Sequence, residues 1–329
     1  MEIGNQNQIL LRISSIIPTK DRPTDLVAAV RSLLVQTVRS FTLLIVDQSR
    51  TDEARHLIEG EVEIANLRPQ GFALHYIRDP GIAGAAAARN YAMRLADGDV
   101  WLFLDDDVVL EPDFLHQLLA AYRDYPRALG VSGIITNYRS ASLPYRIWSA
   151  MFVRGPFHDE RQKIYWNAEK LRKSPPIRVR RFTGALMSFR ASAARDLSFD
   201  ENLDSFQGIS DGEDIAFCEK LGPGVELRIA PRARLQHNRS PLGRLTDHWL
   251  RRHARANCFL YERFYRDQRF SNRLDYLLLW VGYALVAGAS SIRRRSLEPW
   301  RALVTAMNEV RRALMPRSPS AVANSNSRL

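Results

Sequence analysis

The chain has 329 residues and a hydrophobic fraction of 46%, which is ample for a large core and suggests two domains or one domain with an appendage. Its formal charge of +11 is uneven, because residues 1–240 contain 31 Lys and Arg against 30 acidic residues, whereas residues 241–329 contain 16 Arg against 6. A basic C-terminal part predicts an anionic partner. The aromatic interleaving of single-strand nucleic-acid binders and zinc-finger spacing are both absent, so we expect an acidic membrane surface and no nucleic acid.

Two features indicate the compartment of the protein. Cys218 and Cys258 lie in helix-like patterns without neighbouring metal ligands, so we expect buried thiols in a reducing compartment. The N-terminal residues 1–8 are polar and do not resemble a signal peptide. Together these features predict a cytoplasmic location.

The chain alternates between short apolar strands and amphipathic helices. Asp21 or Thr24 is expected to cap the first helix. Polar residues follow the strands at their carboxyl ends, which is typical of a doubly wound α/β domain with a mostly parallel sheet. We expect strands at 10–17, 41–46, 74–77, 100–104, 131–136, 181–190 and 227–230, and helices at 26–36, 51–64, 83–95, 114–125 and 215–221.

Three consecutive aspartates, Asp105, Asp106 and Asp107, end the apolar run 100–104. Adjacent carboxylates repel one another, but together they suit a hard divalent cation, which prefers oxygen ligands. The carboxyl ends of parallel strands are also where α/β sheets bind ligands. This stretch therefore predicts a metal site that receives a phosphorylated substrate. The alternative is a solvated acidic turn before the next helix.

The glycine-containing loop Gly81-Ile82-Ala83-Gly84 matches neither a dinucleotide fingerprint nor a P-loop. A bound nucleotide would therefore be held by a metal ion and by polar groups at the strand ends.

Six motifs in order make the chain resemble the family-two glycosyltransferases, which have the GT-A fold. The resemblance covers about residues 12–240 and implies an inverting, metal-dependent transfer of a sugar from a nucleotide sugar, with Mg²⁺ or Mn²⁺ as the cofactor. The motifs are Pro18-Thr19-Lys20-Asp21-Arg22, Val46-Asp47-Gln48-Ser49, Gly84 with Ala88-Arg89-Asn90, Leu104-Asp105-Asp106-Asp107, Gly184-Ala185 and Gly212-Glu213-Asp214.

The resemblance implies five nucleotide-binding residues. Pro18 and Thr19 would lie against the base and ribose, and Asp47 would accept a hydrogen bond from the base, typically uracil. Arg78 and Arg89 would face the nucleotide pocket. A UDP-sugar is therefore the expected donor.

The resemblance also implies where the metal and the donor sugar bind. Asp105 would approach the ribose or the metal, and Asp107 would bind the ion that bridges the two phosphates, whereas Asp106 has no clear role. His237 matches the position of an additional metal ligand. Gly184 would lie under the donor sugar, where a side chain would crowd the substrate.

The carboxylates Glu213 and Asp214 open a predicted helix. Acidic residues are common at helix N-termini, so simple capping is one interpretation. An inverting transfer also needs a carboxylate that takes the proton of the acceptor hydroxyl. We interpret Asp214 as this base and Glu213 as supporting the acceptor, although the two roles can be exchanged.

Residues 137–181 are rich in aromatic residues and arginine and show little periodicity, so they are either an acceptor-binding region or an irregular loop packed on the sheet. After the catalytic domain at 1–240 we expect a basic helical appendage at 241–315 and a disordered tail at 316–329. Segment 274–292 of the basic appendage is of borderline length and hydrophobicity for a membrane span, with arginines on both flanks. We expect it to pack on the catalytic domain or to lie in a membrane interface.

The sequence therefore predicts a glycosyltransferase at the cytoplasmic face of a membrane, acting on a glycan or lipid-linked acceptor in cell-surface polysaccharide synthesis. A nucleotidyltransferase of the same fold is an alternative, but the glycine- and lysine-rich signature of that class is absent near the N-terminus. An inactive sugar-nucleotide-binding scaffold is another, although it predicts a damaged metal or base motif and both motifs are intact.

Overall fold

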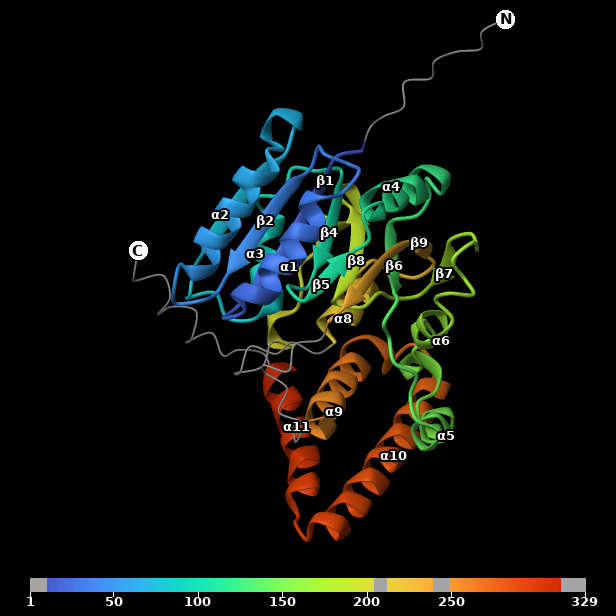
Figure 1. Ribbon diagram of the computed structural model, residues 1–329. Helices are drawn as coiled ribbons and strands as arrows, with labels where there is room; N and C mark the ends of the chain where they lie inside the picture. The colour runs from blue at the N-terminus through green and yellow to red at the C-terminus, as the bar shows by residue number, and fades with distance from the viewer. Residues whose placement is uncertain (1–10, 204–211, 239–248, 315–329) are drawn as a thin grey trace, which may run out of the picture. The chain divides into compact units, whose positions relative to one another are not determined.

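The computed structural model describes residues 11–203, 212–238 and 249–314, and divides the chain into two compact units (Figure 1). The sheet unit comprises residues 1–141 and 159–244. The helical unit comprises residues 142–158 and 245–329.

The first half of the sheet is parallel, in the order β3-β2-β1-β4. Helices α1 and α2 pack against each other, while α3 packs on β1 and β2. Because the chain passes from β3 at the edge to β4 on the far side of β1, the strand order reverses at β1, which is where open α/β sheets bind ligands. The strands are β1 (Ile13–Thr19), β2 (Thr42–Asp47), β3 (Ala73–Arg78) and β4 (Val100–Leu104), and the helices are α1 (Pro23–Leu34), α2 (Glu53–Ala65) and α3 (Ala85–Met93).

The second half of the sheet is mixed and continues from β4 in the order β8-β6-β9-β5, with β7 also paired to β9. Strand β8 runs antiparallel to β4 and β6, whereas β6 and β9 are parallel. In the part of the chain that the structure describes, this makes one nine-stranded sheet. The strands are β5 (Val108–Leu110), β6 (Gly130–Ile135), β7 (Ile177–Val179), β8 (Leu186–Arg190) and β9 (Leu227–His237).

Shorter helices complete the sheet unit. Helix α4 (Phe114–Asp124) packs on β6 and β9. The aromatic core contains Phe103, Phe189, Phe199 and Phe217, and the rings of Phe199 and Phe217 are stacked with centroids 4.2 Å apart. The other elements are α6 (Arg161–Trp166), α7 (Ala191–Ala194), α8 (Glu213–Lys220) and the 3₁₀ turns η1 (Arg68–Gln70) and η3 (Glu201–Leu203).

The helical unit is built around an aromatic cluster of Trp148, Trp249 and Tyr283, whose ring centroids lie 6.1–6.4 Å apart. The amide of Asn257 donates a 2.7 Å hydrogen bond to the Tyr283 hydroxyl inside this cluster. The elements are α5 (Leu143–Phe152), η2 (Gly155–Phe157), α9 (Trp249–Leu260), the π-helical turn η5 (Tyr261–Tyr265), α10 (Phe270–Arg294) and α11 (Glu298–Leu314).

The expected doubly wound α/β fold is confirmed, and most predicted elements begin or end within a few residues of the observed bounds. The predicted cap of α1 is wrong. No side chain caps this helix, which begins at Pro23, and Asp21 adopts a left-handed conformation with its N–H donated to the Ser49 hydroxyl. Strand β9 is longer than predicted because its second half pairs with β5.

The domain boundaries remain predictions. The structure adds one feature that the sequence division lacks, because residues 142–158 belong to the helical unit. The predicted tail at 316–329 lies outside the described residues.

Candidate active site

The candidate site lies at the carboxyl ends of the central parallel strands. Strand β1 ends at Thr19, β2 ends at Asp47, and β4 ends one residue before Asp105. Because β1 pairs with both β2 and β4, these polar side chains follow neighbouring strands at one edge of the sheet. The strand order reverses at the same place, so the topology positions the site.

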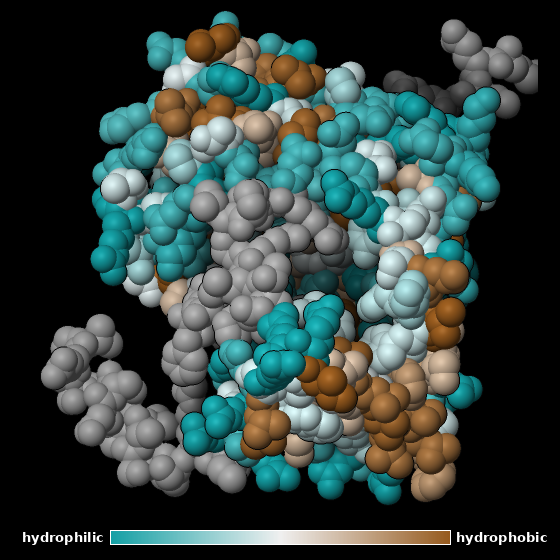
Figure 2. All heavy atoms as spheres, turned by 60° about the horizontal axis from the view of Figure 1, so that its bottom comes forward, coloured by the Kyte–Doolittle hydropathy of each residue, from teal (hydrophilic) through white to brown (hydrophobic). Residues whose placement is uncertain are grey.

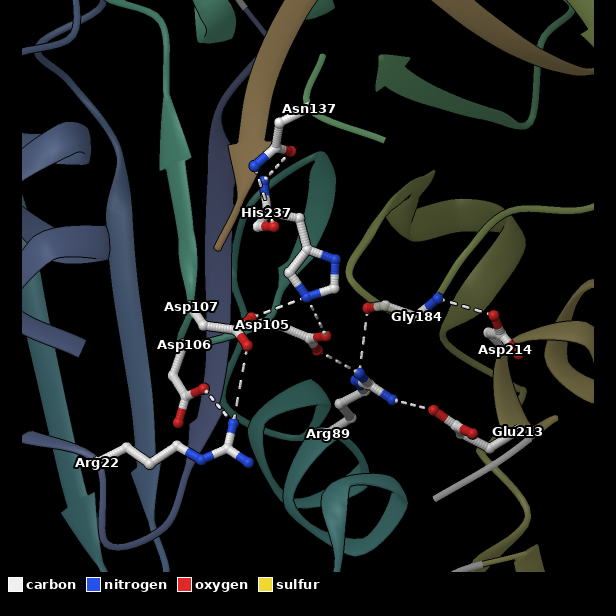
Figure 3. A network of polar contacts seen from close by, with 10 residues as sticks. All are labelled: Arg22, Arg89, Asp105, Asp106, Asp107, Asn137, Gly184, Glu213, Asp214 and His237. Atoms are coloured by element: carbon white, nitrogen blue, oxygen red, sulfur yellow. Dashed lines mark hydrogen bonds and ion pairs between the residues drawn. The ribbon is translucent and has the colours of Figure 1, made fainter. Parts of the chain in front are cut away.

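Among the described residues, one group of potential metal ligands consists of Asp105, Asp107 and His237 (Figure 3). We call these three residues the metal group. One ligand atom from each lies within 4.8 Å of the others. The His237 Nε2 atom is 2.9 Å from Asp107 Oδ1 and 3.9 Å from Asp105 Oδ2. Strands β5 and β9 pair so that Val108 lies opposite His237. This pairing brings His237 next to Asp107, although the two residues are far apart in the sequence.

The donor set fits a divalent cation. Two carboxylates supply the oxygen ligands that Mg²⁺ prefers, and a neutral imidazole is a good ligand for Mn²⁺. The Asp107 side chain is 5% exposed and that of Asp105 33% exposed, so the group is open on the Asp105 side. A buried carboxylate beside a more accessible one lets an ion be held by the protein while further ligands come from a substrate.

Asn137, which sequence reasoning did not single out, fixes the backbone of His237. The His237 N–H donates to Asn137 Oδ1 at 2.9 Å, and the Asn137 amide donates to the His237 carbonyl at 3.2 Å. The Asn238 N–H also donates to the Asp107 carbonyl at 2.8 Å. These bonds hold the end of β9 against the aspartate loop.

Asp106 points away from the metal group and has a different environment. Its carboxylate accepts a 2.7 Å hydrogen bond from the Thr19 hydroxyl and a 3.2 Å bond from Arg22 Nη1. Burial raises the pKa of Asp106 to about 7, although Arg22 and Thr19 oppose this effect. The same Arg22 atom lies 3.9 Å from Asp107 Oδ2. Asp106 therefore fastens the aspartate loop to the end of β1.

Arg89 on α3 connects the metal group to the acidic motif at α8. Its Nη1 donates to Glu213 at 2.8 Å, while Nη2 donates to Asp105 and to the Gly184 carbonyl at 3.1 Å each. The side chain is 2% exposed. A buried guanidinium needs such partners because an unpaired charge in the interior is strongly destabilising. Arg89 thus fixes the metal group relative to the acidic motif (Figure 3).

Glu213 and Asp214 open α8 immediately after Gly212, which has a φ of +90° that favours glycine. The Asp214 carboxylate accepts hydrogen bonds from the N–H groups of Gly184 at 2.7 Å and Ile215 at 2.8 Å. Burial raises the pKa of Glu213 to about 7, with a further increase from Asp214 and opposition from Arg89. Burial also raises the pKa of Asp214. Both carboxylates are therefore more basic than ordinary acidic side chains.

Arg161 on α6 is a further member of the site that the sequence did not reveal. Asp159 binds its guanidinium through two hydrogen bonds of 2.7 and 3.1 Å. Its Nη1 atom is 3.8 Å from Asp214 Oδ2 and makes no hydrogen bond to a described residue. Arg161 opposes the burial effect on Asp214 by lowering the pKa of that carboxyl. The spacing Asp-x-Arg gives no signal that the pair would lie beside Asp214.

Gly184 lies between the two acidic groups and Arg89. A β-carbon at this position would be 3.1 Å from Glu213 Oε1 and 3.5 Å from Arg89 Nη2. A side chain would therefore press on the Arg89–Glu213 pair. This is a separate reason for glycine from the predicted one, crowding of the donor sugar, which stays a prediction.

The other predicted nucleotide-binding residues lie at the ends of β1, β2 and β3. Asp47 is fully buried and accepts hydrogen bonds from the Ser49 N–H at 2.8 Å and the Tyr76 hydroxyl at 2.6 Å. Thr19 contacts Asp106, and Pro18 precedes it in the buried strand β1. Arg78 instead forms a 2.5 Å ion pair with Asp52 at the start of α2. Tyr76, which orients Asp47, was not identified from the sequence.

Comparison with known families shows a match over more than half of the chain. The family model described as glycosyl transferase family 2 matches residues 14–195. An uncharacterized glycosyltransferase from Haemophilus influenzae is 31% identical over 114 residues, which is 35% of this chain and 35% of that protein. One from Rickettsia felis is 30% identical over 102 residues, or 31% of this chain and 16% of that protein. The matched segments thus span about a third or less of these relatives.

Solved structures with the same fold align over most of the chain. S. aureus TarS 1–349 has a TM-score of 0.56 at 16% identity, with 93% of this chain and 81% of that one covered. The mannosyltransferase PcManGT from Pyrobaculum calidifontis, in complex with GDP-Man and Mn²⁺, has a TM-score of 0.54 at 17% identity and 97% and 88% coverage. TarS 1–349 in complex with UDP-GlcNAc has a TM-score of 0.57 at 15% identity and 92% and 82% coverage. These similarities show a common GT-A fold.

Proposed function

The chain belongs to glycosyltransferase family 2, and from this premise we propose that it transfers a sugar, with inversion, from a nucleotide-diphosphate sugar to an acceptor hydroxyl. The observation that carries the proposal is the Arg89 bridge. This single buried side chain joins Asp105 of the potential metal group to Glu213 of the acidic motif. The protein groups that would assist departure of the leaving group and those that would deprotonate the acceptor thus lie next to each other.

Asp105, Asp107 and His237 would hold Mn²⁺ or Mg²⁺. The ion would supply Lewis-acid neutralisation of the negative charge that develops on a nucleoside diphosphate leaving group. The protein's own contribution is orientation. Arg89 binds Asp105, and Asn137 fixes the backbone of His237, so the ligands are held before a substrate arrives.

Asp214 is our choice for the base that takes the proton from the acceptor hydroxyl. Its carboxylate is aimed by the N–H groups of Gly184 and Ile215, and burial makes it more basic. Glu213 is instead committed to Arg89, which makes a positioning role suit it better. A carboxylate with a raised pKa accepts a proton more readily in the transition state than an ordinary one.

We propose a UDP-sugar as the donor. The TarS structure contains UDP-GlcNAc and another structure of the same fold, GalNAc-T7, contains UDP, GalNAc and Mn²⁺, whereas PcManGT contains GDP-Man. In this chain Asp47 is the acceptor that a base N–H would meet at the end of β2, with Pro18 and Thr19 at the end of β1. The resemblance that relates Asp47 to uracil supports UDP over GDP.

We further propose that the acceptor is a glycan or a lipid-linked glycan of the cell surface, and that the enzyme acts at the cytoplasmic face of a membrane. The buried cysteines and the basic helical unit support this location.

Calorimetric titration tests the proposal directly. UDP and GDP are each added to the purified full chain with and without Mn²⁺, and a panel of UDP-sugars is then assayed for donor hydrolysis. We expect Mn²⁺-dependent binding of UDP and slow hydrolysis of one donor. Binding of GDP alone would replace the donor assignment. A folded protein that binds neither nucleotide would overturn the proposed function.

A further inference from the structure

Helix α10 carries an apolar stripe that faces solvent within the helical unit. Six large apolar side chains on one side of this helix are 44–81% exposed, and they recur every three, four or seven residues, which places them on one face. The opposite side contains the buried residues Leu279, Tyr283 and Ala287, which are packed inside the unit. The exposed residues are Phe270, Leu274, Leu277, Val281, Leu285 and Ile292.

Helix α5 extends this stripe into a broader surface. It packs against α10 at Gly282, where a β-carbon would lie 2.7 Å from the Phe152 side chain, and the Trp148 indole N–H donates to the Gly282 carbonyl at 3.2 Å. Leu143, Ile147 and Met151 follow one another at four-residue intervals on α5 and are 54–66% exposed. We call these three residues and the six on α10 the apolar face.

Figure 2 shows the hydrophobic residues of the helical unit gathered toward the lower right of the view, with hydrophilic residues around them. Exposed apolar residues are usually scattered singly over a protein surface. A contiguous exposed apolar surface therefore usually marks an interaction site.

Positive charge surrounds the apolar face. The helical unit has 17 Arg, no Lys and 6 acidic residues, so its formal charge is +11. Arg273 lies near the start of α10 and Arg293 near its end, while Arg146 and Arg154 lie on or just after α5, and all four are exposed. An apolar surface bordered by basic side chains complements an anionic bilayer, where the apolar residues enter the interface and the arginines meet the headgroups.

We propose that the apolar face of α5 and α10 binds the surface of an anionic lipid bilayer. A second copy of the chain is a poorer occupant, because pairing two such faces would bring two units of +11 charge together. The inference rests on the proposed membrane location and names the surface that would bind there, but it does not depend on the proposed sugar transfer.

Helix α10 is long and apolar enough to cross a membrane by length and composition. Its packing favours surface binding instead. One side of α10 contacts α5, α9 and α11, and α9 carries Arg251, Arg252 and Arg255. A spanning orientation would bring these charged helices toward hydrocarbon, which is costly. Surface binding leaves the packed side and its arginines in water.

Vesicle co-sedimentation of the full chain tests the proposal. The probes are vesicles of phosphatidylcholine alone and vesicles of equal parts phosphatidylcholine and phosphatidylglycerol. We expect binding to the anionic vesicles to exceed binding to the neutral ones by about tenfold or more at low salt. The variant Leu277→Glu/Val281→Glu should lose about tenfold or more of this binding, because both side chains would enter the interface.

The matched control is Leu57→Glu/Ile64→Glu, which changes two exposed apolar residues of α2 to the same charge. It should bind anionic vesicles almost like the unmodified chain. Arg273→Gln/Arg293→Gln should weaken binding by roughly fivefold per arginine at low salt and have little effect at high salt.

Three outcomes would overturn the proposal. The first is failure of the unmodified full chain, prepared without detergent, to bind anionic vesicles. Equal loss in the α2 control would be the second. The third is a dimer of the unmodified chain in light scattering that Leu277→Glu/Val281→Glu converts to a monomer without any vesicle binding, since this would assign the face to a second copy. UDP titration of the same variants separates these results from a failure of the catalytic site.

Discussion

The two units use charge in opposite ways. The sheet unit contains 30 basic and 30 acidic residues, and three of its buried arginines are paired with carboxylates: Arg89 with Asp105 and Glu213, Arg161 with Asp159, and Arg234 with Glu111 and Glu169. The helical unit has 17 basic residues against 6 acidic ones. In the first unit charge therefore positions side chains, whereas in the second an excess of charge is available to an external partner.

This difference predicts that removing a single buried charge has a large effect in the sheet unit, whereas removing an exposed charge of the helical unit has a small effect. Buried ion pairs lose much when one partner is removed, because the other charge stays buried without compensation. Exposed charges are solvated and screened, so their loss changes folding stability little.

The largest effect is expected for Asp107→Ala. Loss of this buried carboxylate, the proposed metal ligand, should abolish the Mn²⁺ dependence of UDP binding and lower transfer by about 10³-fold or more, because the developing charge on the leaving group would lose its counterion. Titration of UDP with and without Mn²⁺ measures the effect. Asp124→Ala, at an exposed ion pair with Arg123, is the matched control and should change neither quantity. Unchanged Mn²⁺-dependent binding in Asp107→Ala would refute the metal assignment.

Asp214→Asn should retain UDP binding and lower transfer by roughly 10²–10⁴-fold, since the amide cannot accept the acceptor proton. Single-turnover assays with saturating donor measure the chemical step. Glu213→Gln is the comparison variant, and we expect it to weaken the Arg89 bridge and to retain more activity. If Glu213→Gln is inactive and Asp214→Asn is active, the base is Glu213.

A smaller and pH-dependent effect is expected for Arg161→Met. Arg161 lowers the pKa of Asp214, so its removal should raise that pKa further and keep the base protonated at pH values where the unmodified enzyme is active. Transfer should therefore fall roughly tenfold below neutral pH and change little at alkaline pH. Arg161→Lys should restore much of the loss. A uniform loss at every pH would indicate a purely structural role.

The smallest effect on folding is expected for Leu277→Glu/Val281→Glu in the helical unit. Both side chains are exposed, so the free energy of unfolding should change by about 0.5 kcal/mol or less per substitution. Urea denaturation measures it. A large destabilisation would mean that the apolar face is packed inside the protein, and it would remove the contrast between the two units.

Much of the site could be predicted because it consists of short motifs at strand ends. Asp105 and Asp107 follow an apolar strand, and Glu213 and Asp214 begin a helix, so local patterns were sufficient to single them out. Asn137 and Arg161 were missed, and the contact of Arg22 with Asp106 was not predicted although Arg22 lies in a quoted motif. Each acts on a residue more than 50 positions away in the sequence, and no local periodicity encodes such a contact.

The sequence by itself determined the alternation of strands and helices, the family and the basic C-terminal part, because each depends on residue type and spacing along the chain. Only the tertiary structure decided how the three aspartates differ. Pairing of β5 with β9 brings His237 to Asp107, while Thr19 and Arg22 bind Asp106. It also joined α5 to α10 in one apolar face. Both results depend on long-range packing, in which side chains distant in sequence compete for the same space and the same hydrogen bonds.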